Sequence, residues 1–255
     1  MERCHLMEMN RRIKSFWEGE AQVYSKGIKE ELDSPQKEEW KRLILSYANA
    51  KGKLDILDSG CGPGFFPIIL SEEGHSVTGI DITENMIACA KENAEEAGAD
   101  AEFLTMDCQA LDFPDNSFDL VISRNITWTL DDPSKAYREW LRVLKPGGRL
   151  LVFDACWYLH LFDDELGKLF YENEARLMEK YGRPTHSHND RAEEEALSKL
   201  LFMSDKIRPA WDLEYMLSIG FRKVFSERDI TDRIWDEYAK DAYKISPQFL
   251  VGGEK

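Results

Sequence analysis

Hydrophobic residues follow two different spacings through the middle of the chain. Five short apolar runs lie at 54–58, 77–81, 101–104, 118–122 and 149–154. Segments with helical spacing follow the first, second and fourth of these runs. The short runs predict strands, and the segments between them predict helices. Strands that alternate with helices in this way are typical of a parallel sheet that is covered by helices on both faces.

The strand pattern returns near the end of the chain. Two runs, Phe221–Phe225 and Gln248–Val251, bring the expected number of strands to seven, and Trp211–Ile219 predicts a helix before them. We therefore expect an α/β, Rossmann-like fold with a seven-stranded, mostly parallel sheet. The final residues, Gly252–Lys255, are expected to be frayed.

Helical patterns without strands lie on both sides of the central core. Trp17 and Tyr24 have helical spacing, and Gly27 predicts a break before a second helix. After Asp154 the alternation stops, and acidic helix-like segments at 163–180 and 192–203 predict a helical cap after the fifth strand. These changes divide the chain into a helical lead-in (1–50), a Rossmann-like core (51–154), a helical cap (155–210) and a completion of the sheet (211–255).

Composition narrows the functional classes. The chain has 255 residues, of which 43% are hydrophobic and 11% aromatic, so it can form a large core and is not a disordered protein. Lys and Arg number 33 against 48 Asp and Glu, which gives a net charge of −15 without a basic stripe. That charge repels phosphate backbones, and we expect no nucleic-acid partner.

The five cysteines are scattered and form no C-x-x-C pair. This spacing indicates neither a zinc knuckle nor a disulfide framework, and we expect no metal. The N-terminal residues lack an apolar signal region, and no apolar run approaches the roughly 18 residues that span a bilayer. We therefore expect a cytoplasmic protein without a membrane partner.

The clearest chemical signal is the glycine-rich run Asp58–Gly64, which directly follows a predicted strand and precedes a predicted helix. Glycines allow a sharp turn and let a ligand lie against the backbone. Asp81 follows Asp58 by 23 residues and lies at the end of the next strand. A carboxylate at that place can accept hydrogen bonds from two ribose hydroxyls. The alternative is a structural glycine turn beside a buried or solvated aspartate.

Three details of this run distinguish between ligands that carry a ribose. Its third glycine comes one residue earlier than in the dinucleotide fingerprint, and Phe65 stands where that fingerprint has glycine. Pro63 lacks the backbone N–H that an anion site uses, and Asp58 would repel a pyrophosphate. These features disfavour NAD and favour a ligand without phosphates.

Four motifs occur in a fixed order over about 100 residues. They are Leu57–Gly64, Gly79–Asp81, Asp107–Asp119 and Leu144–Gly148. With these motifs, residues 54–154 resemble the class I S-adenosylmethionine-dependent methyltransferases, in particular the small-molecule branch that includes the ubiquinone and menaquinone C-methyltransferases. The resemblance implies S-adenosyl-L-methionine as the cofactor, S-adenosyl-L-homocysteine as its product, and a small-molecule acceptor.

The resemblance also implies roles for individual residues. The loop from Gly60 to Gly64 would pass under the methionine part of the cofactor, with Asp58 directed toward it. Asp81 would bind the ribose hydroxyls, and Asp107 would accept from the adenine amino group unless it only caps its loop. The full set of cofactor-binding candidates is Tyr24, Asp58, Gly60, Cys61, Gly62, Gly64, Asp81, Ile82, Met86, Asp107, Cys108, Arg124 and Asn125.

Two parts of this set carry further implications. Ser123, Arg124 and Asn125 follow the fourth strand and would line the face where the methyl group moves. Tyr24 matches an aromatic residue that folds over the cofactor in similar proteins. The alternative for Tyr24 is an amphipathic helix that packs Trp17 and Tyr24 into the core.

Methyl transfer from a sulfonium is an in-line displacement, so the protein mainly aligns the reactants and excludes water. A base is needed only where the acceptor holds its proton at neutral pH. The catalytic candidates are Tyr158 and His160, with His186 and His188 as further candidates and Trp128 and Trp157 as aromatic walls. Each histidine has the alternative interpretation of a solvated or satisfied side chain.

Three functions remain open at this point. The first is a methyltransferase that acts on a small molecule, as a monomer or a homodimer. The second is a regulatory or partner protein that keeps the cofactor site without methyl transfer. The third, disfavoured by the glycine spacing, is an NAD-dependent oxidoreductase.

Overall fold

The computed structural model describes residues 2–48, 52–185, 195–196 and 198–255. Within these residues, seven strands form one sheet in the order β3-β2-β1-β4-β5-β7-β6. The strands are β1 (Asp55–Ser59), β2 (Ser76–Asp81), β3 (Glu102–Thr105), β4 (Phe118–Arg124), β5 (Leu144–Asp154), β6 (Lys223–Glu227) and β7 (Phe249–Glu254). Strands β1 to β5 pair in parallel, and β7 runs antiparallel to both of its neighbours. The expected Rossmann-like sheet is confirmed.

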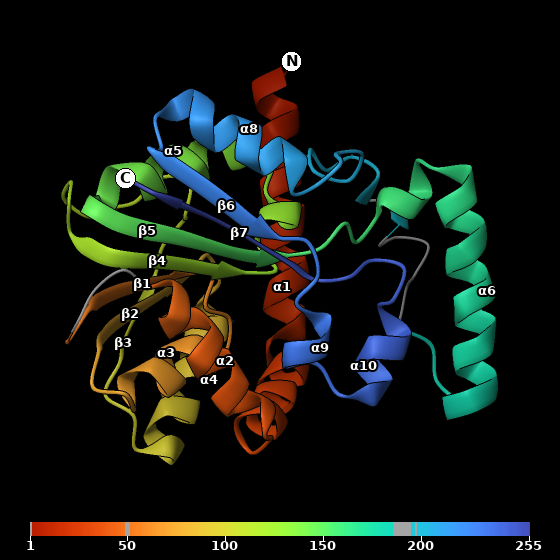
Figure 1. Ribbon diagram of the computed structural model, residues 1–255, viewed down its shortest axis with the longest axis horizontal. Helices are drawn as coiled ribbons and strands as arrows, with labels where there is room; N and C mark the ends of the chain where they lie inside the picture. Colours follow the sequence, from red (N-terminus) through yellow and green to blue (C-terminus); the bar gives the residue numbers. More distant parts are fainter. Residues whose placement is uncertain (1, 49–51, 186–194, 197) are drawn as a thin grey trace.

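Helices cover both faces of the sheet (Figure 1). One face carries α2 (Gln36–Tyr47), α3 (Phe65–Ser71), α4 (Glu84–Ala97) and α9 (Thr231–Ile234), and the other carries α5 (Pro133–Val143) and α8 (Ala210–Ile219). Successive residues of β1 face opposite sides: Ile56 packs in the cluster of Trp40, and Leu57 in the cluster of Trp140. Burial on both faces explains why these strands are continuous apolar runs.

Helix α1 (Glu2–Leu32) runs across the carboxyl ends of the parallel strands (Figure 1). The break expected at Gly27 was wrong, since the helix continues to Leu32 and α2 begins at Gln36. A glycine costs a helix only about 1 kcal/mol relative to alanine, and the burial of Ala21 and Ile28 against the body offsets that. The chain breaks instead at Ser34-Pro35, because proline disfavours the helical conformation of the residue before it.

Between β5 and β6 the described elements are helices, as expected. A short turn, η2 (Leu159–Leu161), leads into α6 (Asp164–Tyr181), which stands away from the sheet in Figure 1. The second helix expected at 192–203 lies partly outside the described residues. Helices α9 and α10 (Glu237–Ala242) were not expected, because four and six residues are too short to show a helical period. No helix among the described residues is long and apolar enough to cross a membrane.

The expectation of a frayed tail at Gly252–Lys255 was wrong. Strand β7 lies between β5 and β6 and continues to Glu254. A Cβ added to Gly252 would lie 2.5 Å from the ring of Phe225, so this glycine makes room for a packed aromatic side chain. A glycine pair that resembles a flexible tail in sequence is thus a packing requirement of the sheet.

Candidate functional site

A cavity of about 770 Å³ lies at the carboxyl ends of the parallel strands, where open α/β sheets bind ligands. Helix α1 forms part of its wall. We name two parts of its lining. The glycine-loop side comprises Asp58, Gly60, Cys61, Gly62, Asp81 and Asp107, and the aromatic side comprises Trp157, Tyr158, Trp235, Asp236 and Tyr243.

The glycine-rich loop turns sharply between β1 and α3. Gly60, Gly62 and Gly64 all have positive φ, at 80°, 49° and 92°. The backbone N–H groups of Gly60 and Cys61 both donate to Ile80 O at 2.8 Å, which fixes the loop against β2. A Cβ on Gly60 would lie 2.2 Å from Ile126, whereas Gly62 lines the cavity with open space around it.

Gly64 has a different place from the other two loop glycines. A Cβ at this position would lie 3.2 Å from Ala90 in α4 and 3.2 Å from Phe103 in β3. Gly64 is not among the residues that line the described cavity. Its lack of a side chain instead allows the loop to pack closely against α4.

Asp58, the fourth residue of β1, lines the cavity and is 2% exposed. Its Oδ1 is buried without a hydrogen-bond partner in the described structure. Burial raises the pKa of Asp58 to about 8, Arg124 partly opposes that rise, and Asp81 adds to it. A carboxyl group in this state gains most from a cationic ligand that donates hydrogen bonds.

Asp81 ends the neighbouring strand β2 and faces the same cavity. Its Oδ2 accepts a bond from Gly62 N at 3.1 Å, and its Oδ1 accepts from Thr83 N at 3.0 Å and Thr83 Oγ1 at 2.9 Å. Burial raises its pKa, and these three bonds oppose the rise. Thr83 occupies the N-cap of α4 as expected, but its hydroxyl donates to Asp81 instead of capping the helix.

The remaining candidates of the glycine-loop side line one continuous surface. Ile82, Met86, Asp107 and Cys108 all contact the cavity. Asp107 Oδ1 accepts from Gln109 N at 2.9 Å. This carboxylate therefore caps its own loop, as the alternative interpretation expects, and it also lines the cavity. Cys108 is buried, and burial raises the pKa of its thiol above the ordinary value.

Ser123, Arg124 and Asn125, at the carboxyl end of β4, make different contacts. Arg124 binds Glu31 of α1 through two bonds of 2.6 and 3.1 Å, and its guanidinium lies 4.7 Å from the ring of Phe65. Asn125 has φ 57° and accepts from Gln248 Nε2 at 3.0 Å. Arg124 and Asn125 line the cavity. Ser123 does not: it is fully buried and donates to Ser59 O at 2.9 Å.

Aromatic residues of α1 cover part of the cavity. Tyr24 lines it, is 39% exposed, and has its ring 5.3 Å from that of Trp17. Trp17 in turn lies 6.1 Å from Trp128. Glu18 holds α1 against α4, because its carboxylate accepts from the N–H groups of Glu84 and Asn85 at 3.1 Å each. Tyr24 is therefore at the cavity wall and not in the core.

The rings of the two catalytic candidates lie 6.2 Å apart, but only one of them lines the described cavity. Tyr158 lines the cavity, with its ring 5.2 Å from Trp128. His160 stacks on Phe170 of α6, with ring centroids 3.8 Å apart, and is not among the residues that line the described cavity. His186 and His188 lie outside the described residues. Among the described residues no group of three or more potential ligands could bind a metal ion.

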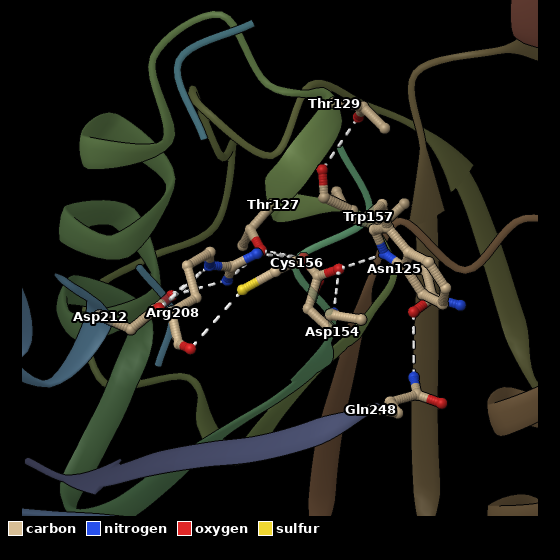
Figure 2. Close-up of polar contacts among 12 residues, drawn as sticks. Asn125, Thr127, Thr129, Asp154, Cys156, Trp157, Arg208, Asp212 and Gln248 are labelled. Atoms are coloured by element: carbon tan, nitrogen blue, oxygen red, sulfur yellow. Dashed lines mark hydrogen bonds and ion pairs between the residues drawn. The ribbon is translucent and has the colours of Figure 1, made fainter. Parts of the chain in front are cut away.

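A buried ion network lies behind the aromatic side (Figure 2). Arg208 is 1% exposed in its side chain and bonds Asp154 at 2.7 Å and Asp212 at 2.6 Å. Burial lowers the pKa of Arg208, but the two carboxylates outweigh burial and hold it well above its ordinary value. Asp154 Oδ2 also accepts from Thr127, and its Oδ1 accepts from Trp157 Nε1 at 2.8 Å. The network thereby fixes the orientation of a cavity-lining indole.

Several of these residues were not found from the sequence. Asp154 is the last residue of a predicted strand, and its position at a carboxyl end was a usable signal. Arg208, Trp235 and Tyr243 carry no such signal, because 50 to 90 residues separate them from β5 along the chain. Only the folded arrangement places Trp235 and Tyr243 beside Trp157, and Arg208 beside Asp154.

Comparison with known sequences identifies part of the chain. Residues 57–152 match the family model described as a methyltransferase domain. Phosphoethanolamine N-methyltransferase 1 of Arabidopsis thaliana is 38% identical over 114 residues, which is 44% of this chain and 23% of that protein. Demethylmenaquinone methyltransferase of Thermus thermophilus is 38% identical over 117 residues, 45% of this chain and 53% of that protein. The matches thus cover about half or less of these relatives.

Solved structures agree with this assignment at the level of fold. Phosphoethanolamine N-methyltransferase 2 of Haemonchus contortus, in complex with S-adenosyl-L-methionine, matches with a TM-score of 0.58 and 21% identity. The match covers 84% of this chain and 51% of that one. The chain therefore carries a methyltransferase domain over residues 57–152, built on the class I methyltransferase fold.

Proposed function

We propose that the protein is an S-adenosyl-L-methionine-dependent methyltransferase that acts on a small-molecule acceptor. The observation that carries this proposal is the pair of carboxylates, Asp58 and Asp81, at the ends of neighbouring strands on one cavity. They lie within the segment that matches the methyltransferase domain. The similar Haemonchus contortus structure contains S-adenosyl-L-methionine, which supports the same cofactor for this protein.

The residues present fit this cofactor. The buried Asp58 Oδ1 lacks a partner, which suits the ammonium of the methionine moiety. Asp81 would accept from the ribose hydroxyls, Ile82 and Met86 would contact the adenine, and Asp107 would accept from its amino group. When bound, the cofactor supplies a methyl group on a sulfonium, and its product is S-adenosyl-L-homocysteine.

The chain's own residues would prepare the acceptor side. Helix α1 and the rings of Tyr24, Trp17 and Trp128 would exclude water from the cavity. Tyr158 lies in the wall and would orient the acceptor, as a catalytic candidate better placed than His160. We propose that residues 155–210, with α6, form the cap over this side.

Two relatives suggest acceptors, phosphoethanolamine and a demethylmenaquinone, by their names. We propose only their shared class, a small molecule, with no nucleic acid or membrane partner, since the chain's net charge is −15. A cytoplasmic monomer or homodimer is consistent with the free thiols of Cys61, Cys89, Cys108 and Cys156.

Calorimetric titration of S-adenosyl-L-homocysteine tests the proposal. Asp81→Ala removes the ribose acceptor and should weaken binding at least tenfold, about 1.5–3 kcal/mol. Asp100→Ala, an exposed aspartate away from the cavity, is the matched control and should bind like the wild type. Absence of binding by the wild type would refute the proposal. Stabilisation by NADH without any effect of S-adenosyl-L-homocysteine would favour an oxidoreductase, and binding without turnover on any acceptor would favour a regulatory protein.

A further inference from the structure

Three aromatic rings meet on the aromatic side of the cavity. The ring of Trp157 lies 5.3 Å from Tyr243 and 6.5 Å from Trp235, and Trp235 lies 4.9 Å from Tyr243. All three line the cavity, and each is only partly buried. Aromatic faces carry a negative potential, and groups of them recognise ammonium cations.

A carboxylate stands directly beside these rings. Asp236 follows Trp235 in the chain, lines the cavity and is exposed. Its Oδ1 caps α10 by accepting from Ala239 N at 2.7 Å. The aromatic faces and the Asp236 carboxylate together present a negative surface to the cavity.

The charges around the whole cavity agree with this sign. Besides Asp58, whose pKa is raised to about 8, its described lining contains the carboxyl side chains Glu30, Glu31, Asp81, Asp107 and Asp236. Arg124 is the one basic residue in that lining, and Glu31 engages it through two bonds. Arg183 lies 3.7 Å over the ring of Tyr238 but does not line the described cavity. Among the described lining residues, an anionic acceptor would therefore meet carboxylates and one arginine, whose guanidinium is already bonded to Glu31.

The aromatic site is also held in place before any ligand arrives. Trp157 Nε1 donates to Asp154, which the buried Arg208 fixes from behind (Figure 2). An indole whose polar group is already bonded offers its ring face and not its N–H to a ligand. Such a fixed ring loses little conformational entropy on binding.

We propose that the aromatic side recognises the methyl acceptor through an organic ammonium group, with Trp157, Trp235 and Tyr243 around the cation and Asp236 as its counter-charge. An ammonium nitrogen has no lone pair, so this group is the one by which the acceptor is recognised, and a different atom of the acceptor receives the methyl group. This inference rests on the proposed function and names its acceptor class. It excludes acceptors whose recognised group is a phosphate or a carboxylate. A single cation over aromatic faces typically gains about 2- to 30-fold in affinity.

Three probes that differ in charge, together with a fourth, flat and neutral probe, 2-naphthol, test the inference. Choline carries the cation, 3,3-dimethyl-1-butanol is its neutral isostere, and phosphocholine adds a phosphate. Each is titrated calorimetrically into wild-type protein, with and without saturating S-adenosyl-L-homocysteine. We expect choline to bind about tenfold more tightly than the neutral isostere and more tightly than phosphocholine. Equal binding of choline and its isostere, or tighter binding of phosphocholine or of the flat neutral probe 2-naphthol, would overturn it.

Matched variants locate the effect. Asp236→Asn removes the charge and keeps the helix cap, because asparagine caps as well as aspartate. Trp235→Leu removes the ring, and Trp235→Phe restores an aromatic face. We expect Asp236→Asn and Trp235→Leu to weaken choline binding about 3- to 10-fold without changing that of the isostere, and Trp235→Phe to recover part of the loss. Trp211→Leu, at a ring stacked on Tyr215 away from the cavity, is the control.

The outcomes separate this inference from the proposed function. If S-adenosyl-L-homocysteine binds and the choline preference is absent, the methyltransferase proposal stands and the ammonium site is wrong. If the choline preference is present and S-adenosyl-L-homocysteine does not bind, the site is a cation site without the proposed activity.

Discussion

The two sides of the cavity treat buried charge in opposite ways. On the glycine-loop side Asp58 is buried with one oxygen unpaired, and its pKa rises to about 8. Behind the aromatic side Asp154 and Asp212 are buried just as deeply, but each forms an ion pair with Arg208. An unpaired buried carboxyl is costly and persists where a ligand completes it, whereas a paired one can serve as scaffold. From this contrast we propose that Asp58 binds the ligand and that Arg208 supports the cavity wall.

Arg208→Met should have the largest effect, because it leaves two carboxylates buried without their cation. We expect a loss of about 3–5 kcal/mol in the free energy of unfolding, measured by urea denaturation. Arg42→Met removes an exposed arginine that pairs with Glu39 and should change stability by less than about 1 kcal/mol. A loss at Arg208 no larger than that of the control would mean that the network is not scaffold.

Gly60→Ala should have an intermediate effect on the other side. The new Cβ would lie 2.2 Å from Ile126 at a φ of 80°, so both strain and overpacking oppose it. We expect a loss of about 2–4 kcal/mol in unfolding free energy and weaker binding of S-adenosyl-L-homocysteine. Gly98→Ala, with φ 64° and no atom within 4 Å, isolates the backbone strain and should cost about 1–2 kcal/mol. Equal losses would show that Ile126 moves aside.

Asp58→Asn should have the smallest effect on stability at pH 5, where the wild-type carboxyl is protonated, and its signature is a pH dependence. The pKa of Asp58 is about 8 in the folded protein and about 4 in an unfolded chain, so the folded state binds more protons between these values. The wild type should therefore lose stability as pH rises from about 4 to about 8. Asp58→Asn removes this contribution.

Urea denaturation of both proteins at pH 5 and pH 8 measures the difference. The wild type should lose more stability between the two values than Asp58→Asn does. Identical pH profiles would mean that Asp58 is ionised in the folded protein, and the contrast between the two sides of the cavity would disappear.

The sheet and the glycine-loop side could be predicted from the sequence because their signals are local. Asp58, the loop glycines and Asp81 lie within 24 residues, at or just after the carboxyl ends of two strands. Because both faces of these strands are buried, their apolar runs are unbroken. Local turn chemistry and strand ends therefore place them together before any tertiary contact is known.

Only part of the aromatic side could be predicted. Trp157 and Tyr158 follow the fifth strand and were candidates, whereas Trp235, Asp236 and Tyr243 lie about 80 to 90 residues after that strand along the chain. His160 and Tyr158 were equally good candidates in the sequence. In the structure His160 stacks on Phe170, whereas Tyr158 lines the cavity. The errors at Gly27 and Gly252 share a cause: tertiary packing overrode the usual conformational preference of glycine.

Strand β7 sets a limit on when this site can form during synthesis. It follows every other strand in chain order, yet it lies between β5 and β6, and Gln248 just before it bonds Asn125 in the cavity wall. The glycine-loop side needs only the first four strands and can form while the chain is still growing. Strand β6 has no hydrogen-bonding neighbour until residues 249–254 are made. A nascent chain would thus contain its glycine-rich loop well before its cavity is closed. A chain stalled on the ribosome before residue 249 would lack the strand that completes the sheet beside the cavity.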